Sequence, residues 1–476
     1  MDKNSRIAII GAGPAGLGAG MYLEQKGYEN YVIFEKTDHV GGKCHSPTFD
    51  GKRHEMGAIM GVSSYYAVQD VEAFTGVTHD GPKLQRVFRY PNGKIDHRFD
   101  KKLKNLPHLF KLKRQIKKFG KLLETKYKGY DICGHIGVSE GRYEGFAVSP
   151  GREPVSGVNP NLKDLALPFK EFCELNKVPL VQEVWIHPFT SFGYGYFDEI
   201  PAAYVLKYLD FQTMMNFMNN NLWTWKEGTQ SIFEALNSKL KNPARLNSII
   251  TKIVRGEKVT ITVNGEEEVF DKLIITAPLQ VGKIDNPIAQ GLDSYLDVTE
   301  KERELFSKID YERYDTFAFN VEKEKYPEAS FYVVDHMTPE TLGHGMVFYM
   351  RWKNEPNQPL ISYRLRKHKN RDETVEEYKQ REELGYEETK AVCLEDIKKL
   401  GLTPLKDKDG NDKIVYEFQT YYFPHVFSED YAKGWYEKVE ALQGENNTYF
   451  AGEIMSFGDI DETLEYSRDL IERHFA

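Results

Sequence analysis

The sequence contains few cysteines, and none of them is arranged in a pair. The four are Cys44, Cys133, Cys173 and Cys393, and neither a CxxC pair nor a metal-like histidine spacing accompanies them. We therefore expect reduced thiols in a cytoplasmic protein, and no metal site.

Long hydrophobic runs and an excess of positive charge are also missing. No stretch approaches the roughly 18 uncharged apolar residues of a membrane span, so we expect none. The net charge of −9 argues against a nucleic-acid partner. The first expected strand begins five residues after Met1, which predicts no signal or transit peptide.

Aromatic residues, by contrast, are abundant. Among 476 residues there are 29 tyrosines and 28 phenylalanines, more than a dinucleotide fold requires. Two interpretations of them remain open, an aromatic-lined pocket and an aromatic-rich core. The length itself predicts about two or three domains.

A strand, a glycine-rich turn and a helix open the chain. The apolar run RIAII precedes GAGPAGLG, in which Gly11 permits a sharp turn, Gly13 lets a phosphate approach the backbone, and Gly16 packs the helix on the strand. The first amides of the helix form an anion site suited to a pyrophosphate. A second strand at 31–34 ends at Glu35, 24 residues after Gly11, where a carboxylate accepts from a ribose hydroxyl. This pattern predicts dinucleotide binding, whereas the GxGxxG alone could be only a tight turn.

Two further segments indicate which dinucleotide is bound. Gly41 and Gly42 lie in KTDHVGGKCHS, a loop expected beside the same ribose and pyrophosphate. Near the other end, TYFAGE delivers Gly452 and Glu453, whose carboxylate suits a ribityl hydroxyl. A turn at Gly458 then opens a helix whose positive end suits the negative charge of a reduced flavin. The predicted cofactor is therefore FAD. No second GxGxxG follows a strand, so we expect no NAD(P)H site.

These motifs together resemble the flavin-containing amine oxidase superfamily. Within it, the segments DHVGGKCHSP, EMGAIMG, PAAYVLKYLDF, LWTWKEGTQ and AGEIMSFGD resemble the bacterial polyenoic fatty acid isomerases, of the linoleate isomerase type. Those enzymes form conjugated dienes from free acids. The resemblance spans nearly the whole chain, apart from residues about 90–160.

The resemblance implies an α/β fold with three parts. These are a Rossmann-like FAD-binding domain of the amine oxidase type, a mixed-sheet substrate domain and a helical cap. The expected ranges are 1–85, 222–285 and 430–476 for the FAD-binding domain, 86–175 for the cap, and 176–221 with 286–429 for the substrate domain.

The expected cofactor contacts fall in the turns and strand ends of these motifs, partly on the strength of the resemblance. They are Gly11, Ala12, Gly13, Pro14, Ala15, Gly16, Glu35, Lys36, Gly41, Gly42, Lys43, Ala58, Ile59, Met60, Trp223, Ile250, Val254, Ala277, Pro278, Gly452, Glu453, Ile460, Asp461 and Thr463. Amine oxidases commonly carry an arginine where this chain has Lys43. A lysine keeps the positive charge but loses the planar fork, and this departure favours the isomerase subgroup.

A fatty acid substrate requires an anchor for its carboxylate and an apolar tunnel for its chain. Arg86 is the expected anchor, through a bidentate charge-assisted pair. The ring of Phe217 is expected to close the tunnel mouth, as the matching positions do in the resembling isomerases. Met60, Phe192 and Tyr194 complete the expected substrate contacts. Without the resemblance, Arg86 is an ordinary surface arginine and Phe217 a core aromatic.

The resemblance implies isomerisation of a free polyunsaturated fatty acid, above all linoleic acid. The flavin takes a hydride from the carbon between two double bonds and returns it further along the chain, without net redox change. This chemistry needs alignment and exclusion of water rather than a general base, so no catalytic side chain is assigned. Two alternatives remain open: an amine or lipid oxidase or desaturase that uses oxygen, and a non-catalytic lipid-binding flavoprotein.

One segment differs in charge from the rest. Residues 101–128 carry eleven Lys or Arg and one acid, with apolar residues at spacings of three and four. The predicted basic amphipathic helix is either a solvated cap helix or a peripheral contact with the inner membrane surface, where a lipid substrate enters. Residues 131–160 are rich in Gly, Ser and Pro and predict a mobile loop or lid.

Overall fold

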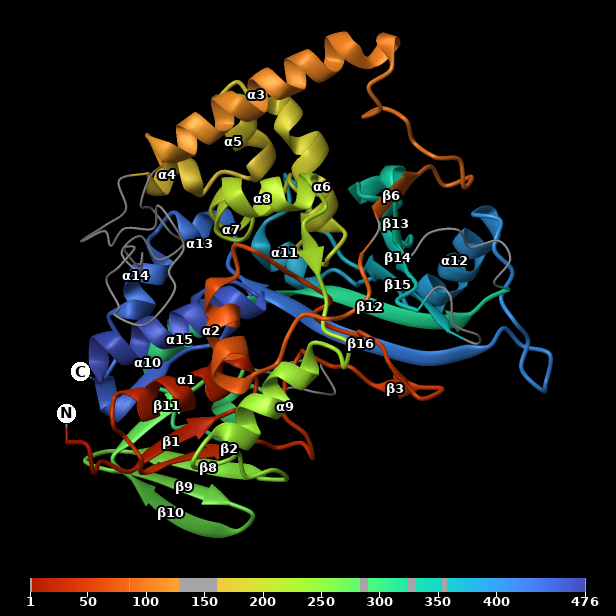
Figure 1. Ribbon diagram of the computed structural model, residues 1–476. Coiled ribbons are helices and arrows are strands. Elements are labelled where there is room, and N and C mark those ends of the chain that lie inside the picture. Colours follow the sequence, from red (N-terminus) through yellow and green to blue (C-terminus); the bar gives the residue numbers. More distant parts are fainter. Residues whose placement is uncertain are drawn as a thin grey trace.

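Two larger sheets of different kinds organise the molecule (Figure 1). The computed structural model describes residues 2–84, 86–127, 161–282, 290–322, 330–352 and 358–475. The loop or lid expected at 131–160 lies outside these residues.

The smaller of the two sheets is parallel, with strand order β17-β11-β1-β2. Its strands are Thr448–Phe450, Lys272–Ile275, Ile7–Ile10 and Tyr31–Phe34. Every residue of β1 is buried, because the strand has a neighbour on each side and helix α1 (Pro14–Gln25) packs on it. Helix α1 in turn contacts α9 (Gln230–Lys239) and α15 (Ile460–His474). The two strands expected around the glycine-rich turn are therefore confirmed, and each of the three ranges assigned to FAD binding contributes a strand.

An antiparallel sheet of three strands precedes β11 in the chain. It consists of β8 (Ile250–Arg255), β9 (Val259–Val263) and β10 (Glu266–Phe270). Buried and half-buried residues alternate along β9, as expected when one face of an antiparallel sheet is more covered than the other.

The larger sheet has six strands in the order β16-β12-β15-β14-β13-β6. They are Ile414–His425, Asp310–Asn320, Pro359–Leu365, Val347–Tyr349, Ser330–Val333 and Arg86–Arg89. Neighbouring strands are antiparallel except β13 and β6, which run parallel, so the predicted mixed sheet is confirmed. Because β6 begins at Arg86, the start of the range assigned to the cap lies at the edge of this sheet.

A group of helices covers the end of the molecule beyond the large sheet, at the top of Figure 1. They are α3 (Leu106–Glu124), α4 (Leu162–Leu165), α5 (Phe169–Leu175), α6 (Gln182–Thr190), α7 (Ala202–Tyr208) and α8 (Phe211–Met218). Helix α3 buries Leu112, Ile116 and Phe119. The Phe119 ring meets Trp185 edge-on at 5.2 Å. The predicted amphipathic helix is confirmed, with a 3-10 turn at Leu103–Asn105 before it.

Shorter elements connect these layers. They are the strand pairs β3 (Thr48–Phe49) with β4 (Lys52–Arg53) and β5 (Gly61–Val62) with β7 (Leu222–Trp223), and helices α2 (Tyr66–Thr75), α10 (Glu300–Phe306), α11 (Val375–Gln380), α12 (Tyr386–Lys399), α13 (Ser428–Tyr431) and α14 (Trp435–Glu440).

A buried carboxyl group lies between the cap helices and the large sheet. The Glu199 carboxyl accepts from the amides of Tyr196, at 2.9 Å, and Lys369, at 2.6 Å. Burial raises the pKa of Glu199 to about 7, against the attraction of the neighbouring His368. The nearby carboxyl of Asp198 also favours the protonated form of Glu199.

This raised pKa predicts a loss of stability as the pH rises. The unfolded Glu199 loses its proton near pH 4.5 and the folded one near pH 7, so the folded state is favoured below pH 4.5 and loses that advantage between the two values. The wild type is expected to lose free energy of unfolding as the pH rises from 5 to 8, and the Glu199→Gln variant lacks this loss. The difference in free energy of unfolding between variant and wild type should therefore shift in favour of the variant by on the order of 2 kcal/mol over this range. Urea unfolding with saturating FAD measures this gain. Parallel stability profiles of the two proteins would contradict it.

Candidate active site

A cavity of about 770 Å³ lies between the parallel sheet and the six-stranded sheet. Most of the predicted cofactor contacts line it: Gly11, Gly13, Pro14, Ala15, Glu35, Lys36, Gly42, Lys43, Ala58, Ile59, Met60, Ile250, Ala277, Pro278, Gly452, Glu453, Ile460 and Thr463. Of the predicted substrate contacts, Met60, Phe192 and Tyr194 line it as well. The cavity thus brings together segments from both ends and the middle of the chain.

The turn between β1 and α1 provides the anion site at one part of this cavity. Gly11 has a φ of +104°, a region that favours glycine. The N-cap residue Gly13 makes no side-chain capping bond, and no acidic residue lies in the first turn of α1. The first amides of the helix are therefore not capped by a side chain, and they fit a pyrophosphate.

Glu35 lies at the end of β2, beside this turn. One carboxylate oxygen accepts from the Ala12 amide at 2.9 Å, and the other accepts from the Thr37 amide at 2.9 Å. These bonds fix the direction of the carboxylate. The Thr37 hydroxyl donates to this second oxygen too, so acceptor capacity for a ribose hydroxyl remains on the oxygen that accepts from Ala12. The residues of this part of the cavity therefore fit the adenosine and pyrophosphate of a dinucleotide.

Lys43 and Glu453 form an ion pair in the cavity wall. The Lys43 ammonium lies 2.6 Å from a Glu453 carboxylate oxygen and 5.1 Å from the centre of the Tyr422 ring. The two residues were predicted separately as contacts of the phosphate and of the ribityl chain. Their ion pair places one positive and one negative group side by side in the cavity wall.

Three tyrosine rings from adjacent strands form a wall of the cavity. Tyr314 on β12 stacks with Tyr363 on β15 at 5.7 Å and with Tyr422 on β16 at 5.5 Å. Their hydroxyls donate to the backbone carbonyls of Ser191, Glu55 and Gly458, respectively. Burial raises the pKa of all three phenols, so they stay neutral. Because their polar atoms are occupied, the rings present an apolar surface.

The sequence prediction did not include these wall tyrosines. It also missed Tyr65 and Tyr208, which line the same cavity. The available signal was the pattern of aromatic-rich sequence in β12 and β16, whereas β15 has Tyr363 alone. Which strands are neighbours, and in which register, had to be known before that pattern could place the rings together.

Arg86 and Phe217 do lie against each other, but neither lines the cavity. The Arg86 guanidinium lies 5.6 Å from the centre of the Phe217 ring and 5.9 Å from that of Tyr332, and it donates to the Phe217 carbonyl. The Tyr332 ring lies 6.2 Å from that of Phe192, which does line the cavity. Arg86 is thus separated from the cavity by one layer of rings.

Several predicted cofactor contacts lie elsewhere than in the cavity wall. Trp223 stacks on His79 at 4.2 Å, Val254 is 43% exposed on β8, and Asp461 accepts from the Val68 amide at 2.9 Å. The backbone neighbours Ala12, Gly16 and Gly41 support the turns without lining the cavity. Val254 lies four residues further along β8 than Ile250, the residue at the start of the strand that does line the cavity.

The fold and the cavity define a dinucleotide-binding flavoprotein with a separate mixed sheet over the cofactor cavity. The chain belongs to the flavin-containing amine oxidoreductase family, whose model matches residues 14–465. The predicted fold class and the predicted cofactor, FAD, are confirmed by this membership.

Three relatives show which members of the family are similar. The crystal structure of a CLA-producing fatty acid isomerase from P. acnes is 45% identical, covers 100% of both chains and has a TM-score of 0.84. A polyenoic fatty acid isomerase of Ptilota filicina is 24% identical over 70% of this chain and 67% of its own length. The FAD-dependent oxidoreductase dpchF of Colletotrichum higginsianum is 22% identical over 94% of this chain and 88% of its own.

Proposed function

We propose that the protein is an FAD-dependent isomerase that converts free polyunsaturated fatty acids, linoleic acid above all, to conjugated dienes. The observation that carries this proposal is the 45% identity, over the full length of both chains, to a CLA-producing fatty acid isomerase. The apolar wall of tyrosine rings supports it, because a hydrocarbon chain needs no polar partner there.

When bound, FAD would supply a hydride acceptor for the carbon between two double bonds, from which the hydride could return to the same molecule. The residues of the chain hold the substrate against movement and exclude the water that would trap a cationic intermediate. The wall of Tyr314, Tyr363 and Tyr422 serves both needs, because its ring faces are apolar and its hydroxyls are already bonded to the protein. Substrate and product are isomers, so no electron pair is left over.

The test is anaerobic incubation with linoleic acid that carries deuterium at the carbon between the double bonds. We expect conjugated diene in which the deuterium has moved within one molecule, and no exchange between labelled and unlabelled substrate in a mixture. Loss of deuterium to water would contradict the hydride mechanism. Oxygen uptake with release of peroxide in air would instead support an oxidase.

Arg86 holds the substrate carboxylate at the tunnel mouth. Its Nε is buried and makes no hydrogen bond within the described residues, so the guanidinium keeps a donor for an anion. The centres of the Phe217 and Tyr332 rings lie 5.6 Å and 5.9 Å from the guanidinium.

The anchor role predicts how an Arg86→Ala variant treats free acids and esters. A charge-assisted bond is worth about 1.5–3 kcal/mol, so KM for linoleate is expected to rise roughly 10- to 100-fold. KM for methyl linoleate, which carries no charge, is expected to stay within about threefold. Competition between acid and ester measures the preference for the free acid. The preference of an Arg86→Lys variant should fall between those of the wild type and Arg86→Ala. An unchanged preference for the free acid would remove Arg86 from this role.

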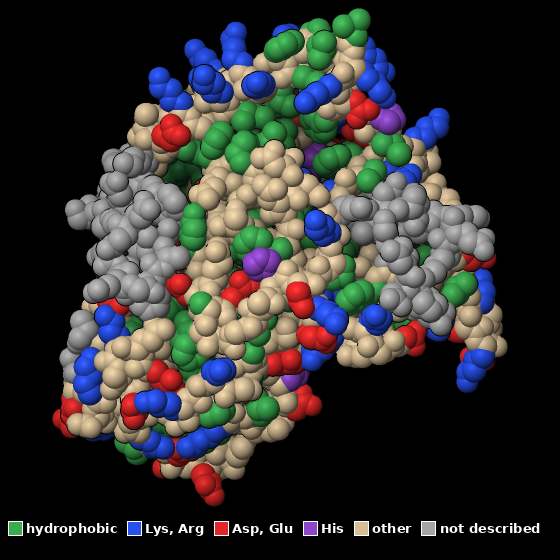
Figure 2. Space-filling model, viewed as in Figure 1, with side chains coloured by type: hydrophobic (Ala, Val, Ile, Leu, Met, Phe, Trp, Pro, Cys, Tyr) green, Lys and Arg blue, Asp and Glu red, His purple; other side chains and the backbone are tan. Residues whose placement is uncertain are grey.

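The outer face of α3 contacts an anionic lipid surface, from which the substrate enters. A row of Lys and Arg side chains follows α3 along the edge of the molecule (Figure 2). Within the described residues, Lys111, Lys113, Arg114, Lys117 and Lys121 form no ion pair. Leu103 and Phe110 are 85% and 70% exposed beside them. In the described residues, none of the helices combines the length and the apolar character needed to cross a bilayer.

Vesicle flotation tests this contact. We expect binding to vesicles that contain phosphatidylglycerol and little binding to pure phosphatidylcholine, because each basic residue contributes about 1 kcal/mol near an anionic surface. A Lys113→Glu and Lys117→Glu double variant is expected to bind at least about tenfold more weakly. The matched control is Lys252→Glu, an exposed lysine on β8. Equal binding of the double variant and the control would refute the contact.

A further inference from the structure

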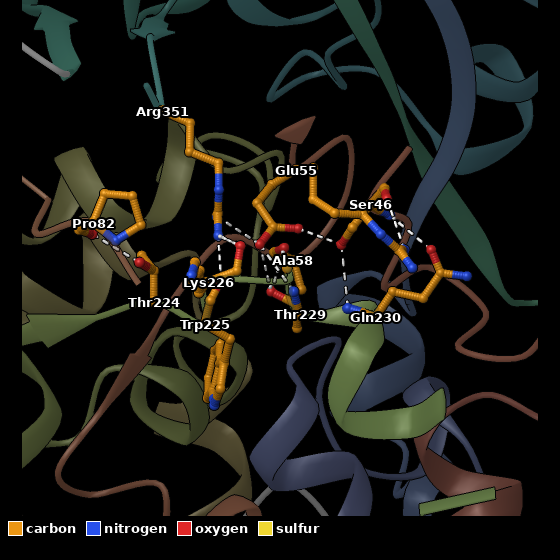
Figure 3. Close-up of polar contacts among 12 residues, drawn as sticks. Ser46, Glu55, Ala58, Pro82, Thr224, Trp225, Lys226, Thr229, Gln230 and Arg351 are labelled. Atoms are coloured by element: carbon orange, nitrogen blue, oxygen red, sulfur yellow. Dashed lines mark hydrogen bonds and ion pairs between the residues drawn. The ribbon is translucent and has the colours of Figure 1, made fainter. Parts of the chain in front are cut away.

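An ion pair with no solvent exposure joins the two walls of the cavity without lining it. The side chains of Glu55 and Arg351 are both 0% exposed, and their charged atoms lie 2.8 Å apart (Figure 3). Glu55 directly precedes Met56–Met60, a segment that lines the cavity. Arg351 follows β14 of the six-stranded sheet. The pair therefore connects the cofactor-binding side to the substrate sheet.

The Glu55 carboxylate is bonded on both oxygens. One oxygen accepts from Arg351 and, at 2.9 Å, from the amide of Thr229. The other oxygen accepts from the Ser46 hydroxyl at 2.6 Å. The backbone carbonyl of Glu55 accepts from the hydroxyl of Tyr363, a wall residue of the cavity, at 2.9 Å. Glu55 therefore has little freedom to shift.

Arg351 makes a second attachment with its other terminal nitrogen. This nitrogen donates to the carbonyls of Trp225 and Lys226 in the turn that follows β7, as Figure 3 shows. One guanidinium thus ties the end of β14 to two segments at once, Glu55 and the turn. Its planar fork suits this task, and a lysine provides only a point charge.

A buried ion pair of this kind adds little net stability compared with apolar residues of the same size. The pair instead constrains geometry, because its hydrogen bonds fix the relative position of three chain segments. Met56–Met60 on one side and Tyr363 on the other are both positioned through Glu55. A shift of about 1 Å between these walls is enough to change a reaction rate by about 100-fold.

We propose that Arg351 is a positioning residue that, through Glu55, sets which carbon of the substrate chain receives the returned hydride. This inference rests on the proposed isomerase function. The conjugated isomers of linoleic acid differ in which end of the five-carbon unit gains the new C–H bond. The spacing of the two walls therefore selects the product isomer.

The experiment compares the conjugated isomers that FAD-saturated wild type and variants form from linoleic acid. In Arg351→Met the ratio of isomers is expected to change at least threefold and kcat to fall about 10- to 100-fold, with KM within about threefold. The isomer ratio and kcat of Arg351→Lys are expected to lie closer to those of the wild type, because lysine keeps the positive charge.

A double variant separates positioning from stability. In Glu55→Gln with Arg351→Met, the neutral amide still accepts from Thr229 and no unpaired charge is buried, so much of the lost stability is expected to return. The isomer ratio is expected to remain as altered as in Arg351→Met. Arg255→Met, which breaks another buried ion pair, with Glu302, is the control that loses stability and keeps the wild-type ratio.

The outcomes are distinct. A wild-type isomer ratio in Arg351→Met, or its return in the double variant, would overturn the positioning role while leaving the isomerase function intact. A changed ratio in the Arg255→Met control would also overturn it, since lower stability would then suffice. No conjugated product from the wild type would overturn both proposals.

Discussion

Replacing Gly16 with alanine is expected to abolish FAD binding and to leave little folded protein. A Cβ atom built on Gly16 lies 1.8 Å from the Gly11 carbonyl oxygen, an overlap with backbone that a side-chain rotation does not relieve. The turn and helix α1 therefore must separate, which opens the anion site. We expect the free energy of unfolding to fall by more than about 4 kcal/mol, a loss typical of severe core defects.

Visible absorbance of bound flavin and a thermal unfolding curve measure this result. Gly256→Ala is the matched control, because its Cβ meets only the Lys258 carbonyl oxygen at 3.9 Å, an ordinary contact. That control is expected to bind FAD with a stability within about 0.5 kcal/mol of the wild type. A yellow, fully folded Gly16→Ala protein would show that the close packing of α1 on β1 is not required.

Replacing Phe457 with alanine is expected to damage both stability and the substrate side of the cavity. The Phe457 ring is 1% exposed, stacks on Tyr208 at 5.0 Å and lies 4.7 Å from Tyr194, and both tyrosines line the cavity. Removing a buried phenylalanine ring costs about 3–5 kcal/mol. Because the tyrosines lose their support, activity on linoleic acid is expected to fall at least tenfold even where the protein remains folded.

Phe306→Ala separates the two effects. Phe306 is fully buried and meets the Phe450 ring at 5.1 Å, but it does not line the cavity. Urea unfolding should show that both variants lose a similar amount of their free energy of unfolding. Steady-state kinetics below both unfolding transitions should show the loss of activity in Phe457→Ala alone. Equal kinetics in the two would mean that the rings behind the wall have no effect on the substrate.

The phosphate end of the cavity was predictable because its determinants are local in sequence. Gly11, Gly13 and the following helix are consecutive, and Glu35 follows the next strand. Only a short-range pattern is needed to place these residues together. The predicted contacts in this part accordingly line the cavity or lie directly beside it.

The substrate end was less predictable because it depends on register across distant strands. Tyr314, Tyr363 and Tyr422 come from three segments, and their stacking exists only when β12 lies between β15 and β16. A shift of one residue would turn each ring to the opposite face. The same reason applies to the Glu55 and Arg351 pair, whose members are 296 residues apart.

The parallel sheet has a consequence for how the chain folds during synthesis. Its central strands β1 and β11 lie at residues 7–10 and 272–275, whereas β17 and helix α15 follow only within residues 448–474. The nascent chain therefore carries an incomplete nucleotide domain, with one side of β11 unpaired, until residues 448–450 have been made. Chaperones that shield unpaired strand edges would act on β11, after residue 275 has been made and before residue 448 follows.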